Sequence, residues 1–224
     1  MSAIRWGASA MRILFSILVS ILMLAGTSVE AQGLTREQAV AALTNTSVQA
    51  RRDAASRLGD VGVMADVAAL AKLLRDADED TRDNAEQSLW RIWARSGNPE
   101  VDRLFEMGVR QLGAGDLPQA IATFTRVIEL QPDFAEGWNK RATLYFMIGE
   151  LRKSLADCDE VIKRNPYHFG ALAGYAQIFV RLEYYDRALD YSRRALAVNP
   201  NMEGVRRNMI LLERLQEERR RQVI

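Results

Sequence analysis

Residues 101–134 read VDRLFEMGVRQLGAGDLPQAIATFTRVIELQPDF, and the next two segments repeat this pattern of residue types with a period of 34 residues. Each unit ends near a proline, at Pro132, Pro166 or Pro200. The other positions that recur in step are Leu104/Trp138/Leu172, Gly108/Ala142/Ala176, Ala120/Ser154/Ala188 and Val127/Val161/Ala195. Small residues allow two helices to cross closely, and large ones fill the space between turns. The pattern therefore predicts stacked helix-turn-helix units.

The three units, 101–134, 135–168 and 169–202, resemble tetratricopeptide repeats (TPRs), and they cover just under half of the chain. The family unit has the same length and the same order of bulky, small, aromatic, glycine and proline positions. Gln111, Arg141 and Glu183 depart from that pattern, since an aromatic, an apolar residue and a glycine are usual there. The resemblance implies an all-α fold, a right-handed α-solenoid of TPR hairpins.

A helix is predicted after the third repeat, within residues 203–224. Val205, Met209, Leu212 and Leu215 follow helical spacing, while arginines and glutamates occupy the other face. The last unit of a solenoid needs a cover with one polar side. We therefore interpret this segment as a C-terminal capping helix.

Residues 34–97 have a different internal period, of 31 residues. The pairs that coincide under this shift are Leu43/Leu74, Arg51/Arg82, Ala54/Ala85 and Leu58/Leu89. This region resembles paired-helix HEAT repeats, which often end a helix in L-G-x-x-G, as at 58–62. Asn98-Pro99 is a typical helix start and opens the TPR region, 99–202. The short junction favours one continuous solenoid over two flexibly linked domains.

The N-terminal residues 1–31 have the features of a secretory signal peptide. Arg5 and Arg12 precede an apolar run at 13–26, and Val29-Glu30-Ala31 offers small residues for cleavage after Ala31. We expect export, to a bacterial periplasm, without stable membrane insertion after cleavage. The alternative is an inner-membrane anchor through residues 13–26, which are shorter than the roughly 20 residues that span a bilayer.

Charge and cysteine content exclude several classes of function. Without residues 1–31 the chain has 28 basic and 28 acidic side chains, interleaved along the predicted helices. Such a balance gives no reason to expect binding to nucleic acid. Cys158, the only cysteine, cannot form an internal disulfide, and its repeat position predicts a buried side chain.

No motif for chemistry is complete. Asp76-x-Asp78-x-Asp80 has the alternation of a calcium loop but lacks the glycine and the final glutamate, so we interpret it as an acidic helix start. His168, the only histidine, stands in a predicted turn and is expected to be exposed. The sequence contains no Gly-rich phosphate loop, nucleophile elbow or zinc signature. We expect no catalytic residues, no metal and no cofactor, and hence no enzyme.

Trp90 and Trp93 lie close to the junction with the repeats. Together with Ile92 they cannot all share one face of a helix, so at least one should contact the repeats or a partner. Packing against the repeats is the favoured interpretation.

The TPR resemblance implies that the first helix of each pair lines a concave groove, where an extended peptide or a helix of a partner binds. The candidate groove residues are Phe105, Val109, Asn139, Thr143, Phe146, Met147, Gln177 and Arg181. Asn139 and Thr143 stand where a clamp for a C-terminal carboxylate would have Lys and Asn. We therefore do not predict recognition of chaperone tails. The capping helix filling the groove remains an alternative.

These features together predict a non-catalytic protein-interaction scaffold of the cell envelope, which binds a protein partner in its groove. The alternative is a structural subunit that forms homo-oligomers or braces a larger envelope complex through helix edges such as those at Trp90 and Trp93.

Overall fold

The computed structural model describes residues 33–222. Residues 1–35 and 36–224 form two separate units, and only the second is described below. The predicted signal peptide at 1–31 and the alternative anchor at 13–26 lie outside the described residues. No helix among those that the structure describes is long and apolar enough to cross a membrane.

The N-terminal part of this unit consists of short helices that pair into hairpins. They are α2 (Arg36–Ala42), α3 (Val48–Val61), η1 (Met64–Asp66), α4 (Val67–Leu70), η2 (Ala71–Arg75) and α5 (Glu79–Trp93). Packing between α3 and α5 buries Ala54, Leu58 and Leu89 completely. These pairs agree with predicted helix pairs over 34–97, but their assignment to HEAT repeats stays a prediction.

The acidic stretch at 76–80 is used within this region. Asp78 caps α5 by accepting a hydrogen bond from the Thr81 N–H at 2.8 Å, and Arg51 binds Asp76 at 2.7 Å. The Arg51 hydrogen bond lowers the pKa of Asp76. The alternating aspartates therefore begin a helix and hold arginines of α3.

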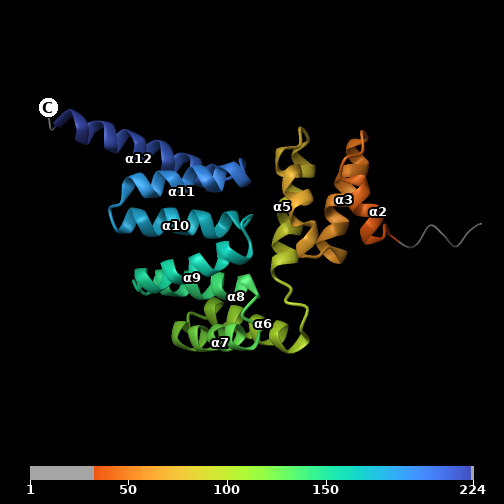
Figure 1. The fold of residues 1–224 in the computed structure, drawn as a ribbon, viewed down its shortest axis with the longest axis horizontal. Helices are drawn as coiled ribbons and strands as arrows, with labels where there is room; N and C mark the ends of the chain where they lie inside the picture. The colour runs from red at the N-terminus through yellow and green to blue at the C-terminus, as the bar shows by residue number, and fades with distance from the viewer. Residues whose placement is uncertain (1–32, 223–224) are drawn as a thin grey trace, which may run out of the picture. The chain divides into compact units, whose positions relative to one another are not determined.

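The repeats follow as α6 (Pro99–Gly113), α7 (Leu117–Leu130), α8 (Ala135–Met147), α9 (Leu151–Arg164), α10 (Phe169–Arg181) and α11 (Tyr185–Val198). Figure 1 shows them stacked in chain order as antiparallel pairs. Asn98 caps α6 with Pro99 in the first turn, as the sequence predicts. The all-α, TPR-like fold is confirmed for the described residues.

Tight turns join the two helices of each pair. Gly115 and Gly149 adopt φ of 78° and 82°, a conformation that glycine takes without steric cost. Glu183 occupies the same repeat position in the third unit, and its φ is 60°. The repeat register therefore forces a glutamate into the left-handed conformation, which costs about 1–2 kcal/mol for a residue with a Cβ atom.

Close crossings depend on the small residues that the repeat pattern predicts. A Cβ atom on Gly108 would lie 2.7 Å from the ring of Phe124, which is fully buried between α6 and α7. The departure at Gln111 is accommodated because its side chain accepts a hydrogen bond from the Thr123 hydroxyl at 2.7 Å. Cys158 is buried, as expected.

Arg141, where the family has an apolar residue, is held by a bidentate ion pair. Its guanidinium group donates two hydrogen bonds of 2.8 Å to Asp157, and these side chains are 14% and 5% exposed. The guanidinium also lies over the rings of Trp138 and Tyr145. The second repeat therefore replaces an apolar contact with a largely buried charge pair.

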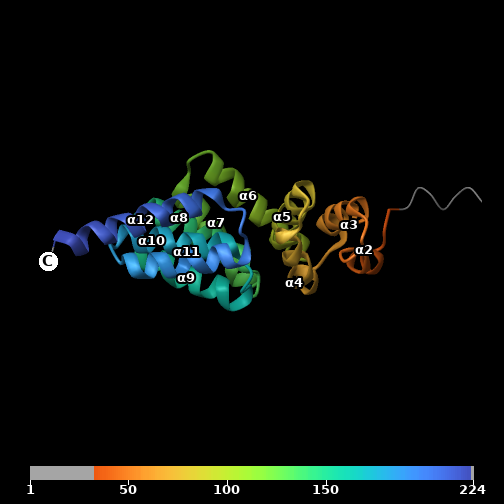
Figure 2. The same ribbon diagram turned by 90° about the horizontal axis from the view of Figure 1, so that it is seen from above.

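The helix α12 (Glu203–Gln222) follows the third repeat and packs on α11 (Figure 2). Leu212 is 6% exposed, and with Met209 it joins the apolar cluster of α10 and α11. Val205 packs on a second cluster that contains Leu172 and Ala195. The helix therefore covers apolar residues of the last repeat.

The N-terminal region does not extend the stack of repeats as one continuous solenoid. Figure 1 shows α3 and α5 running across the direction of α8 to α11. The ring of Trp93 stacks on His168 with centroids 4.5 Å apart, and Trp90 meets Phe169 edge-on at 5.2 Å. The expected packing of the tryptophans on the repeats is confirmed, but the contact is with the turn between α9 and α10.

The prediction of an exposed His168 is wrong, because α5 covers this turn. The side chain is 0% exposed, and its Nδ1 accepts a hydrogen bond from the Ala171 N–H at 3.1 Å, which caps α10. Its Nε2 must then carry the proton, and it lies 2.8 Å from the Glu136 carboxylate. His168 is thus a buried link between two repeats.

Candidate functional site

One position of the repeat is exposed on four alternate helices. It is occupied by Val109 in α6, Thr143 in α8, Gln177 in α10 and Leu211 in α12. Val109 is 40% exposed and Leu211 56%. Three of these residues were predicted to line the groove, and α12 adds a fourth. We call this row the first-helix face.

A pocket of about 310 Å³ lies at the C-terminal end of this face. Phe146, Val180 and Arg181 line it from α8 and α10, and Leu211 and Leu212 line it from α12. The Arg181 guanidinium lies 4.2 Å from the centre of the Phe146 ring and donates to the Phe146 carbonyl at 3.0 Å. The pocket is thus mainly apolar, with a fixed cation at its edge.

A smaller cavity of about 70 Å³ lies along the same face, between α8 and α10. Asn139, Thr143, Phe146 and Gln177 are among the residues that line it. The structure therefore brings together predicted groove residues of the second and third repeats.

Asn139 is engaged within the protein. Its amide nitrogen donates to both carboxylate oxygens of Glu136, at 3.0 and 3.1 Å. Lys140 lies 3.0 Å from the same carboxylate, which is 3% exposed. Burial alone raises the pKa of Glu136, but the interactions with His168 and, to a smaller extent, with Lys140 outweigh it and lower the pKa to about 2. A buried carboxylate thus orients Asn139 at the base of the face.

Two further predicted residues differ in their surroundings. Met147 is 51% exposed and available to a partner. Phe105 is 6% exposed and packs edge-on against Phe124 and Phe134, with ring centroids 5.7 and 5.3 Å away. Phe105 is therefore a core residue, because the first repeat uses its bulk to fill the space between α6 and α7.

The alternative in which the capping helix fills the groove does not match the structure. The helix α12 contributes Asn208, Leu211 and Leu212 to the rim of the larger pocket. It leaves Thr143 and Gln177 exposed and Val180 37% exposed. The helix therefore continues the first-helix face as an additional first helix would.

The described residues contain no cluster of three or more His, Cys, Asp or Glu side chains that could hold a metal ion. Burial raises the pKa of the Cys158 thiol to about 12, so this cysteine stays protonated at neutral pH. What the face offers is apolar surface with a few amides and one arginine, which suits binding of a polypeptide segment.

Sequence reasoning missed a second set of side chains, the amides that precede the three repeat prolines. Gln131 donates to the Ser96 carbonyl at 2.8 Å, and Asn199 donates to the Glu86 carboxylate at 2.9 Å. Asn165 is the equivalent residue in the middle turn. The amide residue before each proline could have been noticed in the sequence. The sequence does not predict that these amides bind residues 86–96.

Comparisons with known proteins agree with this fold. The sequence profile of the family described as tetratricopeptide repeat matches residues 170–202. A TPR repeat-containing protein of Rhizobium etli is 33% identical over 127 residues, which are 54% of this chain and 62% of that protein. The chain therefore spans less than two thirds of that relative's length.

Two solved structures are similar in fold. The TPR domain of Sgt2 from Aspergillus fumigatus superposes with a TM-score of 0.52 at 20% identity, covering 55% of this chain and 83% of that one. The first TPR of Spaghetti (RPAP3), bound to an HSP90 peptide, gives 0.51 at 19% identity, covering 52% and 93%. At such identities the likeness concerns the fold alone. The 34-residue period, the stacked helix pairs and these matches together show that the chain contains an all-α, TPR-like repeat domain.

Proposed function

We propose that this protein is a non-catalytic interaction scaffold, which binds an extended segment or a helix of another protein on the first-helix face. The observation that carries the proposal is the row of exposed side chains at one repeat position, from Val109 to Leu211. A ligand that runs across the stacked helices would meet one such side chain per repeat.

The chemistry of the face favours a ligand with an apolar side chain at one end. Such a side chain enters the larger pocket between Phe146, Val180 and Leu211. Arg181 stands beside it and would pair with an acidic residue of the ligand. One structure of similar fold, the first TPR of Spaghetti, was solved with an HSP90 peptide. We propose a ligand of the same class, a peptide, for this chain, but Asn139 and Thr143 do not supply a clamp for a chain end.

We also propose that the protein works in the cell envelope, after export and cleavage behind Ala31. The support is the sequence of residues 1–31. Mass spectrometry of the N-terminus of the protein purified from cells tests this. A mature chain that starts at Gln32 supports export, while an intact N-terminus in the membrane fraction would favour the anchor at 13–26.

The binding face is tested with a photoreactive amino acid in place of the exposed Thr143, and with the same group in place of Val63, which is also exposed, as a control. Crosslinks to one polypeptide are expected from position 143 only. Changing Met147 and Val180 to glutamate should abolish them, because both side chains are exposed and their replacement leaves the core intact. Equal crosslinking from position 63, or no effect of the two glutamates, would contradict this assignment.

The second hypothesis is a structural subunit that self-associates through Trp90 and Trp93, of which only Trp90 is partly exposed. Trp93 is 3% exposed, and both rings contact Phe169 within the same chain. Homo-oligomerisation through another surface stays a prediction, which light scattering of the purified protein tests.

A further inference from the structure

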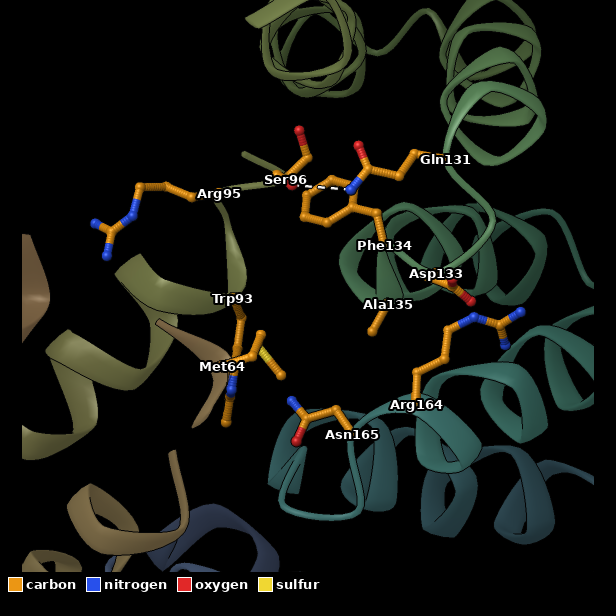
Figure 3. A pocket seen from close by; sticks show the side chains of 10 residues that line it. All are labelled: Met64, Trp93, Arg95, Ser96, Gln131, Asp133, Phe134, Ala135, Arg164 and Asn165. Atoms are coloured by element: carbon orange, nitrogen blue, oxygen red, sulfur yellow. Dashed lines mark hydrogen bonds between the residues drawn. The ribbon is translucent and has the colours of Figure 1, made fainter. Parts of the chain in front are cut away.

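A second cavity, of about 280 Å³, lies between α5 and the turns of the repeats (Figure 3). Trp93 and Met64 line it from the N-terminal region. Phe134, Ala135 and Asn165 line it from the first two inter-repeat turns. It is separate from the first-helix face, so the inference below does not depend on the proposed function.

Two buried hydrogen-bond donors on the wall of this cavity have no acceptor. They are the indole Nε1 of Trp93 and the amide Nδ2 of Asn165, whose side chains are 3% and 1% exposed. Figure 3 shows both nitrogen atoms beside the Met64 side chain. Buried polar groups in proteins are almost always hydrogen-bonded, and leaving one unpaired costs about 1–3 kcal/mol. Two of them on one cavity indicate a site that an acceptor completes.

The orientation of the Asn165 amide follows from its own contacts. Its Oδ1 accepts a hydrogen bond from the Tyr167 N–H at 3.2 Å, so the Nδ2 group is the one that faces the cavity. The equivalent amides in the other two turns have the acceptor that Asn165 lacks. Gln131 and Asn199 each donate to an acceptor in the region 86–96, at 2.8 and 2.9 Å. At Asn165, in the middle turn, the cavity lies where the other two turns have a hydrogen-bond acceptor.

The remaining lining favours a negatively charged acceptor. The helix α8 begins at Ala135, on the cavity, and its N-cap residue Phe134 provides no side-chain cap. The N-terminus of a helix attracts anions through its free N–H groups and its dipole. Arg95 and Arg164 also line the cavity, but Figure 3 shows their guanidinium groups pointing away from it, and they donate to the Gly62 and Glu160 carbonyls at 2.8 Å. The preference for an anion therefore comes from the N-terminus of α8.

We propose that this cavity binds a carboxylate group, which accepts hydrogen bonds from Trp93 Nε1 and Asn165 Nδ2 at the N-terminus of α8. The volume is slightly below the roughly 300–1,000 Å³ of sites for drug-sized ligands, so the ligand has the size of an amino acid or a dipeptide. The apolar walls formed by Met64 and Phe134 contact its carbon skeleton. The carboxylate belongs either to a free acid or to the end of a polypeptide chain.

The test is a titration of the ¹⁵N-labelled full chain, followed at the indole N–H resonance of Trp93, which a Trp93→Phe variant assigns. Three probes are added separately: succinate, the dipeptide Ala-Ala, and Ala-Ala amide, which lacks the carboxylate. At least one of the two acids should shift the resonance saturably, and the amide should bind at least about tenfold more weakly. Tighter binding of Ala-Ala than of succinate identifies a chain end, and the reverse identifies a free acid.

A matched pair of variants separates binding from folding. Asn165→Asp keeps the acceptor for the Tyr167 N–H but removes the donor that faces the cavity. It should therefore weaken binding of the acid probes at least about tenfold. Asn199→Asp makes the same change in the next turn, where it breaks the bond to Glu86. It should lower stability and leave the Trp93 shift unchanged.

Three results would overturn the proposal. They are the absence of a saturable shift with both acids, equal binding of the amide, and equal binding by Asn165→Asp. A crystal grown with the dipeptide that shows only water molecules on Trp93 and Asn165 would likewise assign the cavity to buried water.

Discussion

Replacing Glu136 by glutamine should destabilise the protein at neutral pH and have a much smaller effect in acid. The carboxylate is 3% exposed and is bound by His168, Asn139 and Lys140. The interactions with His168 and Lys140 lower the pKa of Glu136 from 4.5 to about 2. The folded protein therefore holds the ionised form more tightly than the unfolded chain does.

The pKa difference gives the size of the effect. One pKa unit corresponds to about 1.4 kcal/mol, so ionisation of Glu136 stabilises the folded state by about 3 kcal/mol at pH 7. The carboxyl pKa is lower in the folded state, so this stabilisation is present above the unfolded pKa and is lost as the pH falls toward 2. Linkage between ionisation and folding predicts that about 2 kcal/mol of this stabilisation is lost between pH 7 and pH 3.

Urea denaturation followed by circular dichroism measures this at both pH values. The gap in unfolding free energy between wild type and Glu136→Gln should be about 2 kcal/mol smaller at pH 3 than at pH 7. Glu150→Gln is the control, since the Glu150 side chain is 48% exposed, and it should change stability little at either pH. A gap of the same size at both pH values would refute the argument.

Three further substitutions and one control substitution test the packing of the repeats, each by urea denaturation at pH 7. Gly108→Ala should destabilise by about 1–3 kcal/mol, because the new Cβ lies 2.7 Å from a buried phenylalanine ring, while Gly113→Ala, with open space around it, should be neutral or slightly stabilising. Glu183→Gly should stabilise by about 1 kcal/mol, since it relieves a φ of 60°, and a loss of stability would show that this turn is not strained. Arg141→Met should cost about 3 kcal/mol because it leaves Asp157 charged and 5% exposed without its partner, and a neutral result would contradict the importance of that pair.

The repeat pattern predicted most of the fold, because TPR hairpins are specified by contacts within one unit or between neighbours. Asn98-Pro99 marked the start of α6, and Gly115 and Gly149 marked turns that require positive φ. The departures at Gln111 and Arg141 could also be noticed in the sequence. Their compensation by Thr123 and Asp157 could not, because it depends on which side chains face each other across two helices.

Features that depend on contacts distant in sequence were missed or wrong. His168 has the local sequence of a turn, and only the helix α5, some 75 residues earlier in the chain, makes it buried. Phe105 holds a repeat position that faces the groove in the family, yet the ring turns into the core beside Phe124. The other predicted residues of the first-helix face were identified from their positions in the repeat. Its pockets required the structure, since α12 supplies part of the larger one.

The amides before the prolines have a consequence for how this protein unfolds. In most repeat proteins each unit touches only its neighbours, so the ends can fray independently. Here Asn199 and Asn201, at the end of the third repeat, bind Glu86 and the Leu74 carbonyl, more than 110 residues earlier. Releasing the last hairpin must therefore also break contacts with η2 and α5 of the N-terminal region. The array should melt in one cooperative step, and its folding should wait for this long loop to close.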